Sequence, residues 1–399
     1  MKKYIFLLIL LFIPISVFSL EYPNTNSKMV EIYDLNDNKV LYEVDSNKQV
    51  SIASLTKIAT IITAIENIDD MSKEVTMDFK IMSSVDPIAS KAGLKLGDKV
   101  TYKDLLYAAM LPSGADATNA IAISSSGSID NFVDKMNKLA KKLKLENTHF
   151  VNVTGLDEDN HYSTADDVRK LLEYSLKNDL FKELYTTKEY TLSNGLVVKS
   201  TLYKYNTNDE LINKILGSKT GHTENAGYCL STLSNINGHD VITIVLKGDN
   251  SNDHLNDTNT LIDFMNNNYK EEVLVEKDKV VKTLPVVLSK IDKYEIKSNK
   301  EIKKYLPSDY DKNKIKIEYK GLEELNFRNH KGEKIGTINY FYDKELLDKQ
   351  DIVLKEEIKI DLIKVLKEYY LVILGIILLI ILIIFLLTRK KKKKKKARK

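Results

Sequence analysis

The stretch Ala53-Ser54-Leu55-Thr56-Lys57 opens a run of apolar residues, and the fold is best interpreted outward from it. Ser54 and Lys57 are three residues apart, a spacing that places both side chains on one helix face about one turn apart. A serine hydroxyl becomes a nucleophile when a base takes its proton, and an amine is such a base only if burial or a nearby cation lowers its pKa. The residues after Lys57 are almost all apolar, which predicts a buried helix with a partly desolvated first turn.

Ser-x-x-Lys also has an ordinary structural interpretation. Serine is a preferred N-cap residue, so Ser54 could cap the helix while Lys57 extends into solvent. The rest of the chain has to decide between a nucleophile and a cap.

The elements around this stretch predict an α+β domain over residues 28–268. Two β-rich runs flank the turn Asn36-Asp37-Asn38, and the helix opened by Ser54 is expected to reach about Asn67. Residues 70–100 indicate loops and short elements. Helical patterns then give way to strands, and the expected elements are helices at 102–110, 115–123, 128–143, after Ser163 or Thr164, and at about 257–267, with a hairpin at 190–198 and strands near 216–222, 226–233 and 240–246. Strands at both ends and a helical block between them favour an antiparallel sheet.

Residues 271–358 change character and predict a small all-β domain. Short β runs separated by charged turns occur at 279–287, 315–319, 334–340 and 351–354. The following residues, 355–368, are expected to connect this domain to the C-terminal segment.

The two ends of the chain predict export and anchoring. Residues 1–19 resemble a signal peptide, with Lys2 and Lys3 before an apolar run; the alternative is an uncleaved anchor helix. Residues 369–388 are uncharged and overwhelmingly apolar, long enough for a transmembrane helix. The basic residues 389–399 then predict a cytoplasmic tail, so the body is expected outside the cytoplasm, held to the cell membrane by a single pass.

Charge and cysteine content exclude several function classes. The net charge of +4 conceals a segregation, since twelve of the 60 Lys and Arg residues lie in the two ends and leave 48 against 56 acidic residues in the body. A mildly acidic body gives no support to nucleic-acid binding. Cys229 is the only cysteine, so no internal disulfide is expected, and no His or Glu spacing suggests a metal. No cofactor is expected.

Two further polar clusters fall where an acyl-serine enzyme needs them. Leu111-Pro-Ser113-Gly114 lies between two apolar helices and predicts a turn with its hydroxyl pointing outward. Gly217-Ser-Lys219-Thr220-Gly221-His222 lies on an expected strand, where the lysine can face a substrate carboxylate and the glycine permits a ligand close to the backbone.

Ser54-Leu-Thr-Lys57, Ser113-Gly-Ala115 and Lys219-Thr-Gly221 together resemble the three motifs of the serine D-Ala-D-Ala carboxypeptidases, the low-molecular-weight penicillin-binding proteins. The similarity extends over roughly residues 28–355 and includes Asn147-Thr-His-Phe-Val-Asn152, Gly155-Leu and Lys331-Gly-Glu-Lys-Ile-Gly336. It implies a penicillin-binding/β-lactamase-like transpeptidase domain followed by a β-rich domain. The order and flanks of the motifs favour Ser54 as a nucleophile over Ser54 as a cap.

The resemblance also implies roles for individual residues. Ser54 would be acylated, Lys57 would accept its proton, and Ser113 would relay protons to the leaving group. Lys219 and Thr220, with Gly221 and His222, would bind the substrate, and the backbone N–H groups of Ser54 and His222 would form the oxyanion hole. His149 and His161 are interpreted as structural loop residues, and Lys219 as a cation that helps to lower the pKa of Lys57.

Two departures from the family pattern bear on activity. The second motif usually ends in asparagine, and here Ala115 removes that amide; Asp116 or a water could compensate. Near residue 254, where relatives often carry arginine, the chain has His254.

The activity implied is removal of the terminal D-alanine from peptidoglycan stem pentapeptides, with β-lactam antibiotics as covalent inhibitors. The alternatives are a catalytically impaired wall-binding or scaffold protein, favoured by Ala115, and a β-lactamase. A class A β-lactamase would need a deacylating Glu-x-x-Leu-Asn element before the Lys-Thr-Gly strand, and Glu323-Glu-Leu-Asn326 lies after it.

Overall fold

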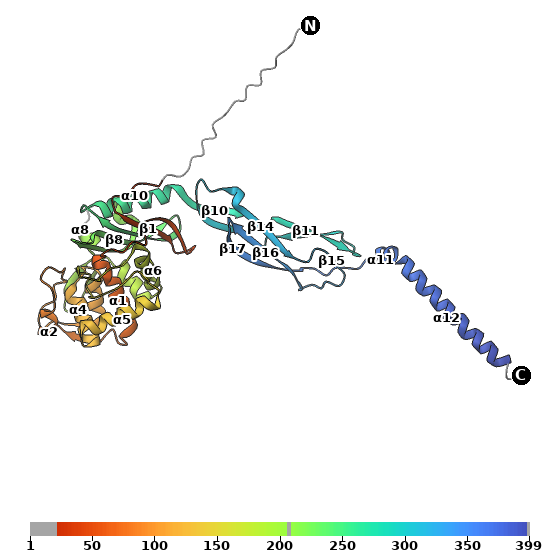
Figure 1. Cartoon of the computed structure of the whole chain (residues 1–399), viewed down its shortest axis with the longest axis horizontal. Helices are drawn as coiled ribbons and strands as arrows, with labels where there is room; N and C mark the ends of the chain where they lie inside the picture. The colour runs from red at the N-terminus through yellow and green to blue at the C-terminus, as the bar shows by residue number, and fades with distance from the viewer. Residues whose placement is uncertain (1–21, 206–208, 397–399) are drawn as a thin grey trace, which may run out of the picture. The chain divides into compact units, whose positions relative to one another are not determined.

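The computed structural model describes residues 22–205 and 209–396, and these residues form two compact units (Figure 1). One unit extends to Lys270 and the other begins at Glu271. The predicted signal peptide, residues 1–19, lies outside the described residues.

The first unit is built on a five-stranded sheet with the strand order β2-β1-β9-β8-β7. Every neighbouring pair is antiparallel, as predicted. The strand that comes first in the sequence, β1, pairs with the strand of this sheet that comes last in the sequence, β9. All six residues of β1 are buried, because α10 covers one face of the sheet and the helical block the other (Figure 1). The strands are β1 (Met29–Asp34), β2 (Lys39–Val44), β7 (Ile215–Thr223), β8 (Gly227–Ile236) and β9 (His239–Gly248).

The centre of the helical block is α1 (Thr56–Asn67), whose first nine residues are all buried. A 3₁₀ turn at Ala53–Leu55 leads into it. Thr101, Ser128 and Thr164 each accept a hydrogen bond from the backbone N–H three residues later, which fixes the starts of α3, α5 and α6. The surrounding helices are α2 (Phe79–Ser83), α3 (Tyr102–Met110), α4 (Ala115–Ser126), α5 (Ile129–Lys142), α6 (Ala165–Leu176) and α7 (Asp179–Thr186).

Several elements differ from the sequence prediction at their ends. α10 (Asp253–Asn268) begins four residues earlier than expected, because its first turn is rich in Asp and Asn and carries little apolar periodicity. The short helices α7, α8 (Thr201–Tyr205) and α9 (Asp209–Lys214) were not predicted. The remaining short strands form two antiparallel pairs, β3 (Glu74–Thr76) with β4 (Lys99–Thr101), and β5 (Glu189–Thr191) with β6 (Val197–Lys199).

The second unit is all-β up to its C-terminal helices. Its sheets are β10-β13, β12-β11-β15 and β14-β16-β17, packed around a core that includes Leu284, Ile296, Leu325 and Ile338. Sequence analysis missed β10, β12, β13 and the two-residue β15; in the first three, lysine or glutamate residues interrupt the apolar pattern. The strands are β10 (Tyr269–Val275), β11 (Val280–Val287), β12 (Lys293–Lys297), β13 (Ile302–Pro307), β14 (Ile315–Gly321), β15 (Leu325–Asn326), β16 (Lys334–Tyr342) and β17 (Glu345–Val353).

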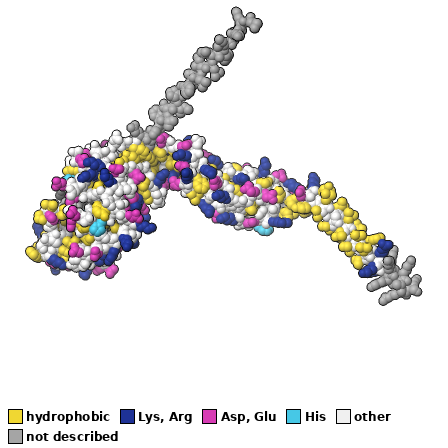
Figure 2. Space-filling model, in the orientation of Figure 1, with side chains coloured by type: hydrophobic (Ala, Val, Ile, Leu, Met, Phe, Trp, Pro, Cys, Tyr) yellow, Lys and Arg dark blue, Asp and Glu magenta, His cyan; other side chains and the backbone are white. Residues whose placement is uncertain are grey.

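Two helices end the chain, α11 (Leu362–Glu368) and α12 (Tyr370–Lys396). Among the described residues, one segment, Tyr370–Lys391 of α12, is long and apolar enough to cross a membrane. Figure 2 shows apolar side chains along this helix and basic side chains near its C-terminal end.

Candidate active site

Ser54 and Lys57 meet as their spacing predicts. The Lys57 Nζ donates a hydrogen bond to Ser54 Oγ at 2.9 Å and a second to the backbone carbonyl of Thr154 at 2.7 Å. No side chain caps the 3₁₀ turn or α1. Ser54 is therefore not a helix cap, and its hydroxyl lies against an amine.

Burial gives Lys57 the character of a base. Lys57 is 2% exposed, and desolvation lowers its pKa from 10.5 to about 7. The negative charge of the Asp116 carboxylate opposes this shift but is the smaller effect. Lys219 is 1% exposed, and burial, reinforced by the charge of Lys57, holds its pKa well below the ordinary value. For both lysines, burial therefore disfavours the charged form of the amine.

Strand β7 carries the third motif against the nucleophile. A Cβ on Gly221 would lie 3.0 Å from both the Ala53 Cβ and the Ser54 nitrogen, so glycine allows the strand to approach the Ser54 turn. Gly221 also lines the pocket beside Ser54, and the close approach of a ligand to its backbone stays a prediction. The Lys219 Nζ donates to the Thr220 carbonyl at 2.9 Å, and the Thr220 hydroxyl bonds that of Thr201.

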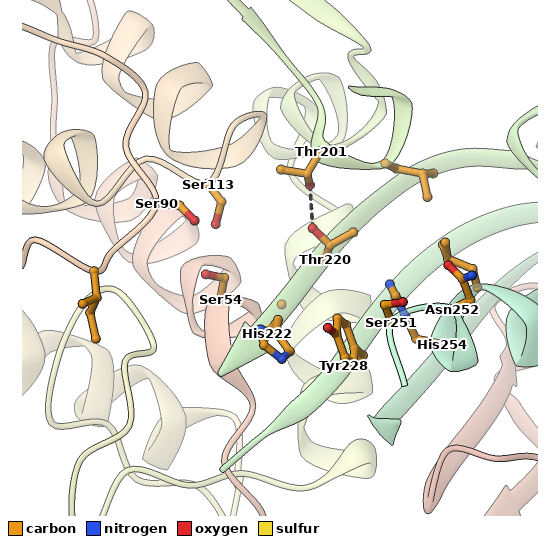
Figure 3. Close-up of a pocket in the computed structure, with 14 residues that line it drawn as sticks. Ser54, Ser90, Ser113, Thr201, Thr220, His222, Tyr228, Ser251, Asn252 and His254 are labelled. Atoms are coloured by element: carbon orange, nitrogen blue, oxygen red, sulfur yellow. Dashed lines mark hydrogen bonds between the residues drawn. The ribbon is translucent and has the colours of Figure 1, made fainter. Parts of the chain in front are cut away.

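The second motif forms a strained turn. Ser113 has a φ of +64°, in the left-handed region that non-glycine residues rarely adopt. Its hydroxyl, predicted to point outward, is buried, lines the pocket beside Ser54, and has no hydrogen-bond partner among the described residues (Figure 3). Such an unsatisfied hydroxyl in a pocket is available to a substrate.

The amide missing at Ala115 is not replaced by its neighbour. Ala115 is buried, and the Asp116 carboxylate accepts hydrogen bonds of 2.8–3.1 Å from the backbone N–H groups of Ala92, Gly93 and Leu94. Asp116 therefore holds the loop beside the pocket and does not take the place of the amide.

Sequence reasoning missed the loop that orients Lys57. The Asn152 Oδ1 accepts hydrogen bonds from the backbone N–H of Thr154 and of Gly155, which presents the Thr154 carbonyl to Lys57. Gly155 has a φ of +83°, and a Cβ there would lie 1.9 Å from the Ala53 carbonyl oxygen. A backbone acceptor leaves no residue-type signal, although the glycine in Asn152-x-x-Gly155 marks the turn.

The Ser54 hydroxyl opens into a pocket of about 520 Å³ (Figure 3). The rings of His222, Tyr228 and His254 stack along one side, with centroids 4.1 and 5.5 Å apart. Burial lowers the pKa of His254 to about 4, so this residue is neutral at neutral pH. The lining residues that the structure describes include no carboxylate; they are Ser54, Ile88, Ser90, Ser113, Thr201, Leu202, Thr220, Gly221, His222, Tyr228, Ser251, Asn252, His254 and Leu255.

Two other predicted features are structural. The His161 ring bonds the Thr56 hydroxyl at 2.8 Å, and Cys229 is a buried thiol in β8.

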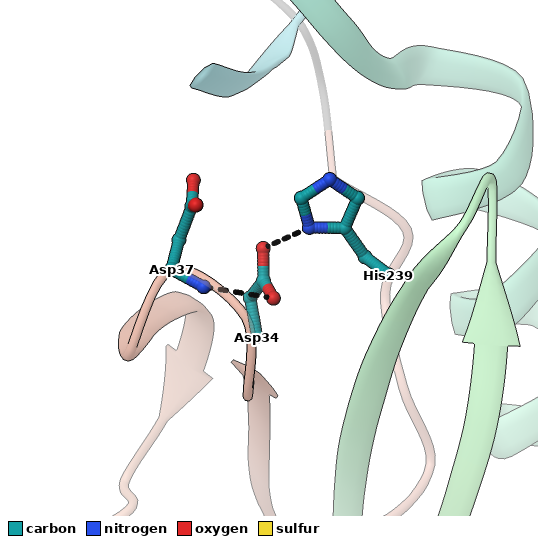
Figure 4. A group of neighbouring side chains, drawn as sticks. All are labelled: Asp34, Asp37 and His239. Carbon is teal, nitrogen blue, oxygen red and sulfur yellow. Dashed lines mark hydrogen bonds and ion pairs between the residues drawn. The ribbon is translucent and has the colours of Figure 1, made fainter. Parts of the chain in front are cut away.

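Asp34, Asp37 and His239 form a cluster of potential metal ligands at two neighbouring turns (Figure 4). One Asp34 oxygen accepts the backbone N–H of Asp37, and the other pairs with His239 Nδ1 at 2.8 Å. Since both Asp34 oxygens are used in this way, we interpret the cluster as a link between the turns.

Comparisons with known proteins agree with this geometry. Residues 16–250 match the family model described as D-alanyl-D-alanine carboxypeptidase, and residues 269–360 match the C-terminal domain of penicillin-binding protein 5. The D-alanyl-D-alanine carboxypeptidase DacF of Bacillus subtilis is 30% identical over 337 residues, 84% of this chain and 86% of DacF. The D-alanyl-D-alanine carboxypeptidase of Streptomyces sp. strain K15 is 35% identical over 225 residues, 52% of this chain and 75% of that protein.

Solved structures share the fold. Penicillin-binding protein 5 of Haemophilus influenzae superposes with a TM-score of 0.63 at 24% identity, covering 86% of this chain and 100% of that one. The Streptomyces K15 DD-transpeptidase superposes with a TM-score of 0.56 at 28% identity, covering 61% of this chain and 98% of that one. With three motifs in one pocket and a family match over more than half its length, the chain belongs to the D-alanyl-D-alanine carboxypeptidase family of low-molecular-weight penicillin-binding proteins.

Proposed function

We propose that this protein is a serine D-Ala-D-Ala carboxypeptidase that removes the terminal D-alanine from peptidoglycan stem pentapeptides. The observation that carries the proposal is the 2.9 Å hydrogen bond between Ser54 Oγ and a buried Lys57 amine whose pKa is about 7. A neutral amine at this distance is a base poised for the serine proton.

In the acylation step, Ser54 Oγ attacks the carbonyl carbon of the penultimate D-alanine as Lys57 Nζ accepts the hydroxyl proton. The backbone N–H groups of Ser54 and His222 stabilise the developing oxyanion. The C–N bond to the terminal D-alanine then breaks, and the leaving amine receives the proton from Lys57 through the Ser113 hydroxyl. The product is an acyl-Ser54 ester and free D-alanine.

Substrate binding is assigned to the exposed side of β7. Thr220 and His222 line the pocket, whereas Lys219 does not, so the Thr220 hydroxyl donates to the terminal carboxylate and Lys219 supports Thr220 through the hydrogen bond from its Nζ to the Thr220 carbonyl. Hydrolysis of the ester by water completes the cycle. A β-lactam acylates the same serine and blocks it.

One observation favours the alternative of a catalytically impaired wall-binding or scaffold protein. Ala115 offers no amide to the substrate carbonyl, and a lost donor of this kind typically costs a few kcal/mol of transition-state stabilisation. A protein of this type binds muropeptides but releases little D-alanine. A β-lactamase that uses a carboxylate as deacylating base is disfavoured, because the described pocket lining contains no carboxylate; nitrocefin turnover tests this.

We also propose a membrane location. Residues 1–19 direct export, the helix at 369–388 spans the cytoplasmic membrane once, and the basic residues 389–399 stay in the cytoplasm. The catalytic unit then faces the peptidoglycan. Protease accessibility in intact cells and in lysed cells distinguishes this orientation from its reverse.

The decisive experiment compares the wild type with Ser54→Ala. Fluorescent penicillin is expected to label the wild type at Ser54, and a pentapeptide ending in D-Ala-D-Ala to yield free D-alanine; the variant should do neither. Label on another residue, or D-alanine release by Ser54→Ala, would overturn the proposal.

A further inference from the structure

One end of the second unit, next to α11, exposes a cluster of large apolar side chains (Figure 1). We call this end the tip and define it as residues 287–293, which include the turn between β11 and β12, together with residues 359–368. Six large apolar side chains of the tip are 38–67% exposed: Val287, Ile291, Ile360, Leu362, Ile363 and Leu366. Single exposed apolar residues are ordinary, but six in two adjoining segments form a patch that indicates a partner.

Backbone hydrogen bonds join the two segments of the tip. The Lys290 N–H donates to the Lys359 carbonyl at 3.0 Å. The Asp361 N–H donates to the Leu288 carbonyl at 2.9 Å. These two bonds flank an antiparallel β-bridge between the segments. The turn and the start of α11 are therefore fixed to each other and form one surface.

The orientation of α11 is the reverse of that of a helix in a soluble domain. Its Lys364 faces the β unit, where Nζ donates to the Ser289 carbonyl at 2.7 Å and to the Asp292 carboxylate at 2.6 Å. The three exposed apolar residues of α11 lie at positions i, i+1 and i+4, which share one helix face. An amphipathic helix on a soluble domain buries its apolar face and exposes its lysines. Here a lysine holds the helix, and the apolar face is left for a different apolar environment.

The tip lies close to the membrane that α12 is proposed to cross. The candidate span begins at Tyr370, directly after the seven residues of α11 and Tyr369. Seven helical residues and one extended residue place the start of α11 at most roughly 14 Å from the span. The polar layer of one bilayer leaflet is roughly 5–8 Å thick, so α11 lies within this layer or just above it. The turn that is joined to α11 lies there as well.

The charges of the tip fit a lipid surface. Of its three carboxylates, Asp292 is paired with Lys364, and Asp361 accepts hydrogen bonds from the first backbone N–H groups of α11, which leaves Glu368. Four of its five lysines make no ion pair with any residue that the structure describes: Lys290, Lys293, Lys359 and Lys367. Unpaired lysines beside an exposed apolar face are typical of segments that lie on an anionic membrane.

We propose that the tip is a membrane-docking surface that seats the second unit on the outer leaflet of the cytoplasmic membrane, with Ile291 and the apolar face of α11 at the level of the lipid headgroups. The phospholipid surface itself covers the apolar patch. The inference rests on the proposed membrane location and goes beyond it, because a single spanning helix only tethers a domain, whereas a docked tip also fixes the second unit against the lipid.

The test places one fluorescent label at a time on the full chain, in vesicles of equal parts phosphatidylcholine and phosphatidylglycerol. Cys229 is buried, so a thiol-reactive NBD dye reacts at an introduced cysteine. Ile291→Cys carries the tip label, and Leu378→Cys, in the middle of α12, carries the span label. Val280→Cys carries the matched control label, because Val280 is 44% exposed against 46% for Ile291. Val280 lies at the far end of β11, seven residues or roughly 23 Å from Val287.

We expect the emission of the tip label to shift to shorter wavelength and to be quenched by lipids that carry a nitroxide near the headgroup. The span label should be quenched by lipids that carry a nitroxide deep in the acyl chain. The control label should respond only to a water-soluble quencher. In the triple variant Leu362→Ser/Ile363→Ser/Leu366→Ser, the tip label should lose most of its quenching by lipid, while the span label keeps its own.

A tip label that stays open to the water-soluble quencher while the span label is quenched by lipid would overturn the inference and leave the membrane location intact. A span label that lipid does not quench would overturn both. A shift of the tip label without quenching by lipid would mean that a second copy of this chain covers the tip, which also contradicts the inference. Unchanged quenching of the tip label in the triple variant would refute the joint surface of the turn and α11.

Discussion

The strongest prediction concerns the pH dependence of acylation. An ordinary lysine with a pKa of 10.5 is neutral in roughly one molecule in 3,000 at pH 7, whereas with a pKa of about 7 Lys57 is neutral in about half. Acylation needs this neutral form. The rate should therefore be nearly constant above pH 8 and fall as the pH drops through 7.

The magnitude follows from the same pKa. At pH 5 about 1% of Lys57 is neutral, so the second-order rate constant for a fluorescent penicillin should be roughly a hundredfold lower than at pH 8. Stopped-flow fluorescence measures this constant directly and avoids the deacylation step. The pocket also contains two histidines, His222 and His254. Burial lowers the pKa of His254 to about 4, below the range from pH 5 to pH 8, so His254 does not produce the predicted fall in rate.

Two variants isolate the role of Lys57. His222→Asn should keep the acid limb of the profile, because the limb belongs to Lys57. Lys57→Arg keeps the positive charge but cannot lose its proton, so its acylation should be at least a thousandfold slower across the whole range. A flat profile between pH 5 and pH 8 in the wild type, or a limb that disappears in His222→Asn, would refute the assignment.

Three other perturbations have defined outcomes. Gly155→Ala should lower Tm and abolish penicillin labelling, since its Cβ would lie 1.9 Å from the Ala53 oxygen; unchanged labelling contradicts this. Lys57→Met should stabilise the fold in urea titrations by up to about 4 kcal/mol at pH 7, because the lowered pKa of Lys57 destabilises the folded state at every pH below 10.5; above pH 10.5 this gain should vanish. Ala115→Asn should raise kcat/KM for D-alanine release about tenfold; a decrease would show that Ala115 is adapted to this pocket.

Sequence analysis predicted the features that depend on residue type and spacing. Ser54 and Lys57 meet because an i,i+3 spacing works in any helical turn, and the sheet was predictable from apolar runs that alternate with turns. The features it missed depend on tertiary packing. The Thr154 carbonyl has no sequence signature, and Ser113, whose hydroxyl is buried, lies in a turn with a left-handed φ that the sequence did not indicate.

Electrostatic effects were predicted only in part. Lys219 was expected to lower the pKa of Lys57, but burial is the main cause for both lysines, and burial depends on how β7, α1 and the 152–155 loop pack together. A spacing rule cannot give the extent of desolvation. Some strands of the β domain were missed for a similar reason, since strands such as β12 alternate lysine and glutamate with a few buried residues.

The same features make a last prediction about stability. Two desolvated lysines, an unpaired Ser113 hydroxyl and a positive φ at that residue all destabilise the empty site, and the packing around α1 holds them in place. A β-lactam brings a carboxylate toward Thr220 and a hydrogen-bond partner toward Ser113, so acylation should raise Tm by several degrees. Differential scanning fluorimetry with and without penicillin measures this. Ser54→Ala, which cannot be acylated, should show no shift, and an unchanged Tm in a fully labelled wild type would mean that the strain is not relieved by a ligand.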